Sequence, residues 1–195
     1  MEAALVVFAE RGYAATSIEE VIRRAGLSRG TFYFNFSGKD DLFFAVVAEH
    51  IDRPSQALME LTASAPGDLP TSGAVSVGLA QILRQERPAL LLLEEYWGQA
   101  ARDDRLATRY RQRQANLRTV LAEALRERHR HTGVPLSFDA DRLAEAFMAL
   151  ARGLALESVV DSDAVDDELF GDVLALVYDG LRLRGAAAVP PHVHE

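Results

Sequence analysis

The fold is decided by residues 16–36, which read TSIEEVIRRAGLSRGTFYFNF. A capping box begins this stretch, because Thr16 or Ser17 can cap a helix and an acidic residue follows three positions later. Apolar residues at helical spacing then continue for two turns, and Gly26 can adopt the left-handed conformation that ends a helix. Ser28 can cap a second short helix. Two short helices joined by a tight turn indicate a helix-turn-helix.

Helical patterns continue outside this stretch, and we see no alternating strand pattern. The first helix is expected to stop at Gly12, and a linker is expected over Thr62–Gly73, which is rich in Pro and Gly. The other helices are expected at residues 29–35, 39–61, 74–85, 88–100, 103–131, 139–160 and 166–184.

The expected fold is therefore all-α. We expect an N-terminal three-helix helix-turn-helix domain over residues 1–47. A larger antiparallel helical domain for effector binding and dimerisation is expected over residues 48–184, followed by a flexible tail over residues 185–195.

Composition excludes several classes of protein. The chain has 195 residues, of which 49% are hydrophobic, so it can bury a sizeable core. It contains no cysteine, which excludes disulfides, thiolate metal sites and a cysteine nucleophile. We find no uncharged apolar run long enough to span a membrane, no basic leader, no phosphate-binding glycine loop and no catalytic constellation. We therefore expect a cytoplasmic protein that is not an enzyme, with no membrane partner, no metal and no cofactor.

Charge is distributed unevenly along the chain. The net charge is −8, yet the stretch from Val21 to Lys39 carries four basic residues and no acidic one. On charge alone, this stretch is more often a solvated face than a polyanion site. The side chains of the short helix after Gly26 nevertheless suit a DNA major groove, which is about 12 Å wide. Ser17 and Lys39 lie at expected helix N-termini, where main-chain N–H groups favour a phosphate.

Three segments carry a resemblance to a known family. They are residues 8–18 (FAERGYAATSI), residues 25–36 (AGLSRGTFYFNF) and residues 39–42 (KDDL). Together they closely resemble the DNA-binding domain of the TetR family of transcriptional regulators, over essentially Ala3 to Val47. The resemblance implies a homodimeric, ligand-responsive regulator, usually a repressor.

The resemblance also implies the DNA-contacting residues. Residues expected to cap the second helix and touch the DNA backbone are Thr16 and Ser17. Phosphate contacts are expected from Tyr33 and Lys39, and base contacts from Arg29, Thr31, Phe34 and Asn35. The remaining members of the expected interface are Ser28, which caps the recognition helix, and Gly30, which allows its close approach.

Two departures from the family pattern affect these expectations. Family members usually begin with a basic segment and about one more helical turn, whereas this chain begins at Met1, so we expect coding sequence upstream. Ile22 stands where the family usually has a small residue, which implies a wider helix crossing.

The expected larger domain contains candidates for effector binding. The family places its pocket among the middle helices. The candidates for contacts with an unknown small molecule are therefore Tyr96, Trp97, Gln112, Asn116 and Phe147. The alternative is that the aromatic members of this set are simply core or capping residues.

Two apolar stripes lie on the last two expected helices. In the family these helices pair with their copies, so the stripes predict a dimer interface made by Leu143, Phe147, Leu150, Leu154, Val173, Val177 and Leu181. The alternative is that both stripes pack inside one protomer. We favour the dimer because each helix is apolar over more than one narrow face.

These observations predict a repressor that binds a pseudo-palindromic double-stranded DNA operator as a homodimer and is released by a small-molecule effector. One alternative is a small helical ligand carrier or enzyme with a vestigial helix-turn-helix. Another is a protein-interaction module that uses the same helices without DNA.

Overall fold

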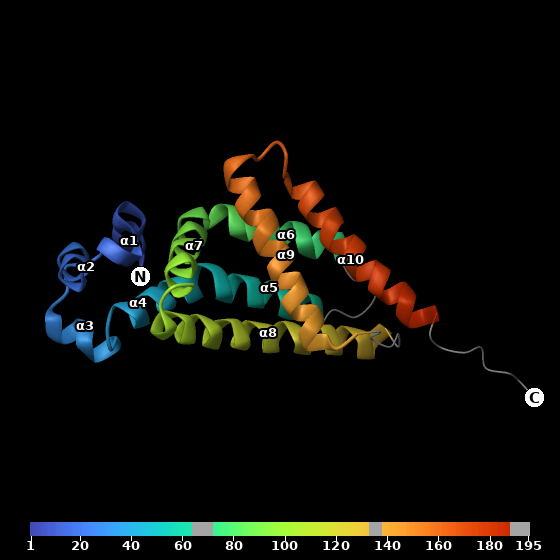
Figure 1. Ribbon diagram of the computed structural model, residues 1–195, viewed down its shortest axis with the longest axis horizontal. Helices are drawn as coiled ribbons and strands as arrows, with labels where there is room; N and C mark the ends of the chain where they lie inside the picture. Colours follow the sequence, from blue (N-terminus) through green and yellow to red (C-terminus); the bar gives the residue numbers. More distant parts are fainter. Residues whose placement is uncertain (64–71, 133–137, 188–195) are drawn as a thin grey trace, which may run out of the picture. The chain divides into compact units, whose positions relative to one another are not determined.

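The computed structural model describes residues 1–63, 72–132 and 138–187, and all the regular elements in these ranges are helical (Figure 1). This confirms the expected all-α fold. The elements are α1 (Glu2–Ala15), α2 (Ile18–Ala25), α3 (Arg29–Asn35), α4 (Lys39–Val47), a π-helical turn (Ala48–Asp52), α5 (Arg53–Ala63), α6 (Ser72–Gln85), α7 (Arg87–Ala100), α8 (Asp104–Thr132), α9 (Ala140–Val160) and α10 (Asp167–Ala187).

The expected helices agree with these bounds to within a few residues, with two differences. The helix expected over residues 39–61 is interrupted by the π-helical turn. The tail was expected from residue 185, but α10 continues to Ala187. Most of the expected linker and the rest of the tail lie outside the described residues.

The helix-turn-helix is built from local signals. Ser17 is the cap of α2, because its hydroxyl accepts a hydrogen bond from Glu20 N at 3.3 Å. Gly26 ends α2 at φ 67° and ψ 27°, and the Leu27 N–H donates to Ile22 O at 3.1 Å, which closes the turn. Ser28 caps α3 by accepting from Thr31 N at 3.0 Å.

The π-helical turn has a local cause. Pro54, the second residue of α5, has no N–H to donate to the carbonyl of His50, and its ring would clash with that carbonyl in a regular helix. A turn with wider hydrogen-bonded rings accommodates the proline, and Arg53 N–H accordingly donates to Ala48 O.

The chain divides into two compact units. The first contains residues 1–54 and 85–113, and the second contains residues 55–84 and the chain from residue 114 onward. The unit that contains the expected DNA-binding domain thus also includes α7 and the first part of α8, which the expected boundary at residue 47 did not include.

Aromatic residues form the core of the first unit. Phe8, Phe43 and Tyr96 are each 0% exposed. The rings of Phe43 and Tyr96 stack with centroids 4.8 Å apart, and the ring of Tyr13 meets that of Tyr96 edge-on at 4.8 Å. Tyr96 belongs to α7, so α7 packs against α1 and α4 within this core (Figure 1).

The second unit has a core of small and aliphatic residues. Ala122, Leu125, Ala140, Leu143 and Ala144 form one buried cluster between α8 and α9. α9 also packs against α10. A search of the described helices finds none with the length and apolar character needed to cross a membrane.

Candidate nucleic-acid interface

α3 presents an unusual surface. Its core contact is Phe32, which is 2% exposed, whereas the neighbouring Tyr33 and Phe34 are 51% and 90% exposed. Arg29 and Asn35 are exposed on the same short helix. A large aromatic side chain left almost wholly in solvent points to a binding surface, since folding gains nothing from its exposure.

Several α3 side chains already have partners beside this surface. Arg29 forms a 2.5 Å ion pair with Glu19 of α2. Asn35 Nδ2 donates to Thr31 O at 2.8 Å, and the hydroxyls of Ser28 and Thr31 lie 2.9 Å apart. These interactions hold the side chains in one arrangement while leaving them at the surface.

Thr16 lies inside the domain rather than at the surface. It is 3% exposed, and its hydroxyl donates to Gly12 O at 2.7 Å. Of the two possible caps, Ser17 therefore caps α2, and its side chain stays exposed at the helix N-terminus.

Lys39 also differs from its expected role at the surface. Its Nζ donates to the carbonyls of Tyr13, Ala14 and Thr16 at 2.9, 3.1 and 3.1 Å. Burial lowers the pKa of the Lys39 ammonium, and the negative charges of Asp40 and Glu95 oppose that shift. These carbonyls lie at and just after the end of α1 at Ala15, where no further residue of that helix follows to donate to them.

A set of acid–arginine pairs was missed by the sequence analysis. Arg105 of α8 pairs with Asp40, Arg109 pairs with Asp41 at 2.9 Å, and Arg113 pairs with Asp52 at 2.5 Å. A signal for them exists in the sequence, since arginines at positions 105, 109 and 113 share one helical face. This spacing predicts a row of arginines, but it does not show which acidic residues they pair with.

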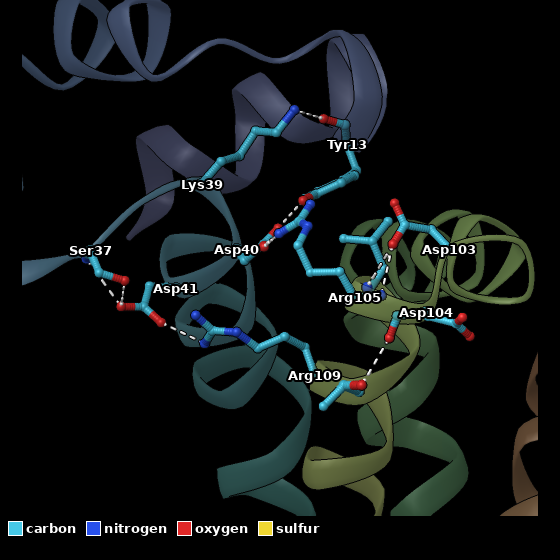
Figure 2. Close-up of polar contacts among 11 residues, drawn as sticks. Tyr13, Ser37, Lys39, Asp40, Asp41, Asp103, Asp104, Arg105 and Arg109 are labelled. Atoms are coloured by element: carbon cyan, nitrogen blue, oxygen red, sulfur yellow. Dashed lines mark hydrogen bonds and ion pairs between the residues drawn. The ribbon is translucent and has the colours of Figure 1, made fainter.

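Figure 2 shows the polar contacts that the first turn of α4 makes with its neighbours. Asp40 accepts hydrogen bonds from the Tyr13 hydroxyl and from Arg105. Burial and the hydrogen bond to Asp40 raise the pKa of Tyr13 above its usual range. Asp41 accepts from Ser37 and Arg109, and these hydrogen bonds lower the pKa of Asp41.

The pair between Asp52 and Arg113 is the most buried of the set. Their side chains are 11% and 10% exposed, and both carboxylate oxygens accept from the guanidinium. Burial nevertheless raises the pKa of Asp52, an effect that the charge of Arg113 only partly opposes.

The expected effector residues divide between the two units, with Tyr96, Trp97 and Gln112 in the first and Asn116 and Phe147 in the second. Tyr96 lies in the aromatic core of the first unit, where its hydroxyl has no hydrogen-bond partner among the described residues. Burial raises the pKa of Tyr96 to about 12. Trp97 is 46% exposed, Gln112 and Asn116 are exposed, and Phe147 packs against the core of the second unit. The structure thus gives Tyr96 and Phe147 core contacts.

The predicted dimer stripes are partly used inside the protomer. Leu143 is 5% exposed and belongs to the core of the second unit. The half-buried members of the stripes are Phe147, Leu150, Leu154 and Val173, and Val177 is 36% exposed. The side chain of Leu181 lies outside the described residues. Among the side chains described on these two helices, the most exposed large apolar ones are instead Val160 and Leu176, at 87% and 71%.

The first part of the chain matches curated transcriptional regulators. A family model described as bacterial regulatory proteins of the tetR family matches residues 1–46. The transcriptional activator FasR of Mycolicibacterium smegmatis is 44% identical over 50 residues, which are 26% of this chain and 23% of that protein. The regulator AcrR of Shigella flexneri is 32% identical over 68 residues, which are 35% of this chain and 32% of that protein. This chain thus spans a third or less of these relatives.

The second part of the chain and the whole fold match regulators as well. A family model described as BetI-type transcriptional repressor, C-terminal, matches residues 78–182. A solved transcriptional regulator from Rhodococcus sp. RHA1 is 25% identical, with a TM-score of 0.64 over 97% of this chain and 96% of that chain. SmeT of Stenotrophomonas maltophilia, solved with triclosan, is 25% identical, with a TM-score of 0.65 over 100% of this chain and 94% of that chain. The chain therefore belongs to the TetR family of transcriptional regulators.

Proposed function

We propose that this chain is a ligand-responsive repressor that binds a pseudo-palindromic DNA operator as a homodimer, in the cytoplasm. The observation that carries the proposal is the surface of α3. This capped helix is anchored by Phe32 and leaves Phe34 90% exposed beside Arg29. A short helix of this kind can enter the major groove with its exposed side chains against the base edges.

The roles of the α3 residues follow from their chemistry. Arg29 is suited to a guanine, Asn35 to an adenine, and the ring of Phe34 to a thymine methyl group. The Thr31 hydroxyl completes the base-facing set, and Gly30 adds no side chain that would hold the helix away from the groove.

Phosphate contacts are proposed for the edges of this surface. Ser17 and Ser28 lie at helix N-termini, where main-chain N–H groups and the helix dipole attract anions. The Tyr33 hydroxyl is the third candidate, since its side chain is 51% exposed. The side chains of Thr16 and Lys39 donate hydrogen bonds to main-chain carbonyls of the same domain. We therefore propose no phosphate contact for them, only that they stabilise the segment before α2.

Dimerisation is proposed through α9 and α10. Leu176 and Val177 of α10 are 71% and 36% exposed, and at Gly153 and Gly180 an added Cβ would meet nothing within 4 Å. Small residues allow close helix approach, and a second copy of the same two helices would cover these side chains. A twofold dimer would present two copies of α3 to a symmetric operator.

The effector proposal rests on the relatives. SmeT is named as the repressor of a multidrug efflux pump and was solved with triclosan, a small apolar molecule. We propose a small-molecule effector for this chain as well. Trp97, Gln112 and Asn116 remain candidates for its contacts, along with Tyr96 and Phe147.

Selection of DNA duplexes from a random pool by the full chain tests this function. A repressor of this kind should enrich a symmetric sequence, bind it with two protomers per duplex, and lose affinity steeply as salt rises. Failure to enrich any sequence, both with this chain and with one extended at its N-terminus, would refute the proposal.

A further inference from the structure

The segment Gly12–Thr16 contains the last residues of α1, from its break at Gly12, and the residue that follows. We name it the α1–α2 turn, and it leaves several main-chain groups without helical partners. Gly12 has φ 74° and ψ 168°, so the helical path of α1 breaks there. Main-chain groups released from a helix need other partners where water does not reach them. Two charged side chains from other helices supply these partners.

Glu95 of α7 binds the N–H groups of the α1–α2 turn. Its carboxylate accepts from Tyr13 N at 2.9 Å and from Ala14 N at 3.3 Å. Gln99, one helical turn further along α7, donates to the same carboxylate at 3.1 Å and so orients it. The carboxylate lies so close to Gly12 that an added Cβ there would be 2.6 Å from Glu95 Oε2.

Lys39 of α4 binds the carbonyl groups of the same turn. Its ammonium has three N–H donors, and three carbonyls of the turn accept from it at 2.9–3.1 Å. An anion thus accepts from the N–H groups of the turn and a cation donates to its carbonyls. Both sets of hydrogen bonds are charge-assisted and therefore stronger than neutral ones. Figure 2 shows the Lys39 contact beside the link from Tyr13 through Asp40 to Arg105.

The α1–α2 turn leads directly into the DNA-reading helices. Thr16, its last residue, precedes Ser17, the cap of α2, and α2 is joined to α3 by the Gly26 turn. We propose that Glu95 and Lys39 are positioning residues for DNA binding, which fix the start of α2 from α7 and α4 without touching DNA. This inference rests on the DNA-binding role proposed for α3.

The first test uses the sign of a charge effect. Glu95→Gln removes one negative charge, and so does the control Glu123→Gln at an exposed position of α8. Loss of an anion alone should strengthen binding to DNA slightly. If Glu95 positions the turn, Glu95→Gln instead weakens binding to the selected duplex by about tenfold, since the loss involves charge-assisted hydrogen bonds.

The second test separates positioning from phosphate contact at Lys39. A residue that neutralises a phosphate contributes about 0.9 to the slope of log affinity against log salt concentration. We expect Lys39→Gln to weaken binding to the selected duplex while leaving this slope unchanged. The control Arg87→Gln, which removes an exposed cation from α7, should change the affinity little.

Two further measurements exclude a loss of fold as the cause. Gln99→Ala loosens Glu95 without removing it and should weaken binding in the same direction, to a smaller extent. In Glu95→Gln the amides of Tyr13 and Ala14 should exchange with solvent faster than in the wild type. A stoichiometric titration with the selected duplex should still show that all of the variant protein can bind DNA. Binding to a scrambled duplex should stay within about twofold of wild type, because non-specific affinity depends on phosphate charge.

Three results would overturn the inference. One is equal or tighter binding of the selected duplex by Glu95→Gln, as expected for the control, and another is a reduced salt slope for Lys39→Gln. The third is a wild-type chain that selects no duplex, which would remove the proposed function together with this inference. The first two leave wild-type binding intact, so the failures can be distinguished.

Discussion

Replacing Gly12 by alanine tests whether the α1–α2 turn is fixed by both its backbone conformation and Glu95. Gly12 has φ 74° and ψ 168°, a region essentially restricted to glycine. An L-residue held there costs about 1–3 kcal/mol. The added Cβ would also be 2.6 Å from Glu95 Oε2, so the carboxylate would have to move away from the N–H groups of Tyr13 and Ala14.

The expected free-energy cost of Gly12→Ala is the sum of these two effects. A hydrogen bond to a charged group contributes about 1.5–3 kcal/mol, and we count one, because the bond to Ala14 is exposed. The free energy of unfolding should therefore fall by about 2.5–6 kcal/mol. Gly26→Ala is the matched control, since Gly26 also has positive φ but an added Cβ would meet nothing within 4 Å. Its expected cost is the backbone cost alone, about 1–2 kcal/mol.

Urea unfolding of a double-mutant cycle measures the two effects separately. In a Glu95→Ala background the displaced carboxylate is absent, so Gly12→Ala should cost only about 1–3 kcal/mol. If Gly12→Ala costs the same in both backgrounds, and no more than Gly26→Ala, then contact with Glu95 does not restrict this position and the reasoning is wrong.

Three further predictions concern other parts of the chain. Because the folded-state pKa of Asp52 is raised, the cost of burying its charge is fully present above that pKa and is relieved as pH falls through it. The free energy of unfolding, measured with urea at several pH values, should show this dependence in the wild type but not in Asp52→Asn. Arg113→Met leaves the buried carboxylate unpaired and should destabilise the fold by about 3–5 kcal/mol. Phe34→Ala should change unfolding by less than about 0.5 kcal/mol but weaken duplex binding by about 1–3 kcal/mol in an anisotropy titration. Leu176→Asp should give folded monomers by sedimentation, whereas Leu174→Asp, at a position only 4% exposed, should unfold the chain.

Local signals in the sequence were sufficient to predict the helices and most of the residues at which they begin and end. The caps at Ser17 and Ser28 and the left-handed Gly26 are each determined by residues within four positions. The π-helical turn was missed because the apolar pattern of α4 continues through it. Only the effect of Pro54 on the preceding turn marks it.

The partners of the charged side chains could not be predicted from the sequence. Glu95 binds Tyr13, which lies 82 positions earlier, and no periodicity connects the two residues. Lys39 could be placed at a helix N-terminus, but its contact with the carbonyls at the end of α1 depends on how α1 and α4 pack, which no local signal shows. Leu143 illustrates a third difficulty, since an apolar stripe does not distinguish the core of its own protomer from a surface between two copies.

The composition of the first compact unit has a consequence for engineering this family. A chimaera that exchanged only residues 1–47 for those of another regulator would leave Glu95, Arg105 and Arg109 opposite foreign side chains. The natural transplantable module is discontinuous, residues 1–54 together with 85–113. A designer who wants new DNA specificity with the same sensor should therefore change only the exposed face of α3, and leave every side chain that touches α7 or α8 as it is.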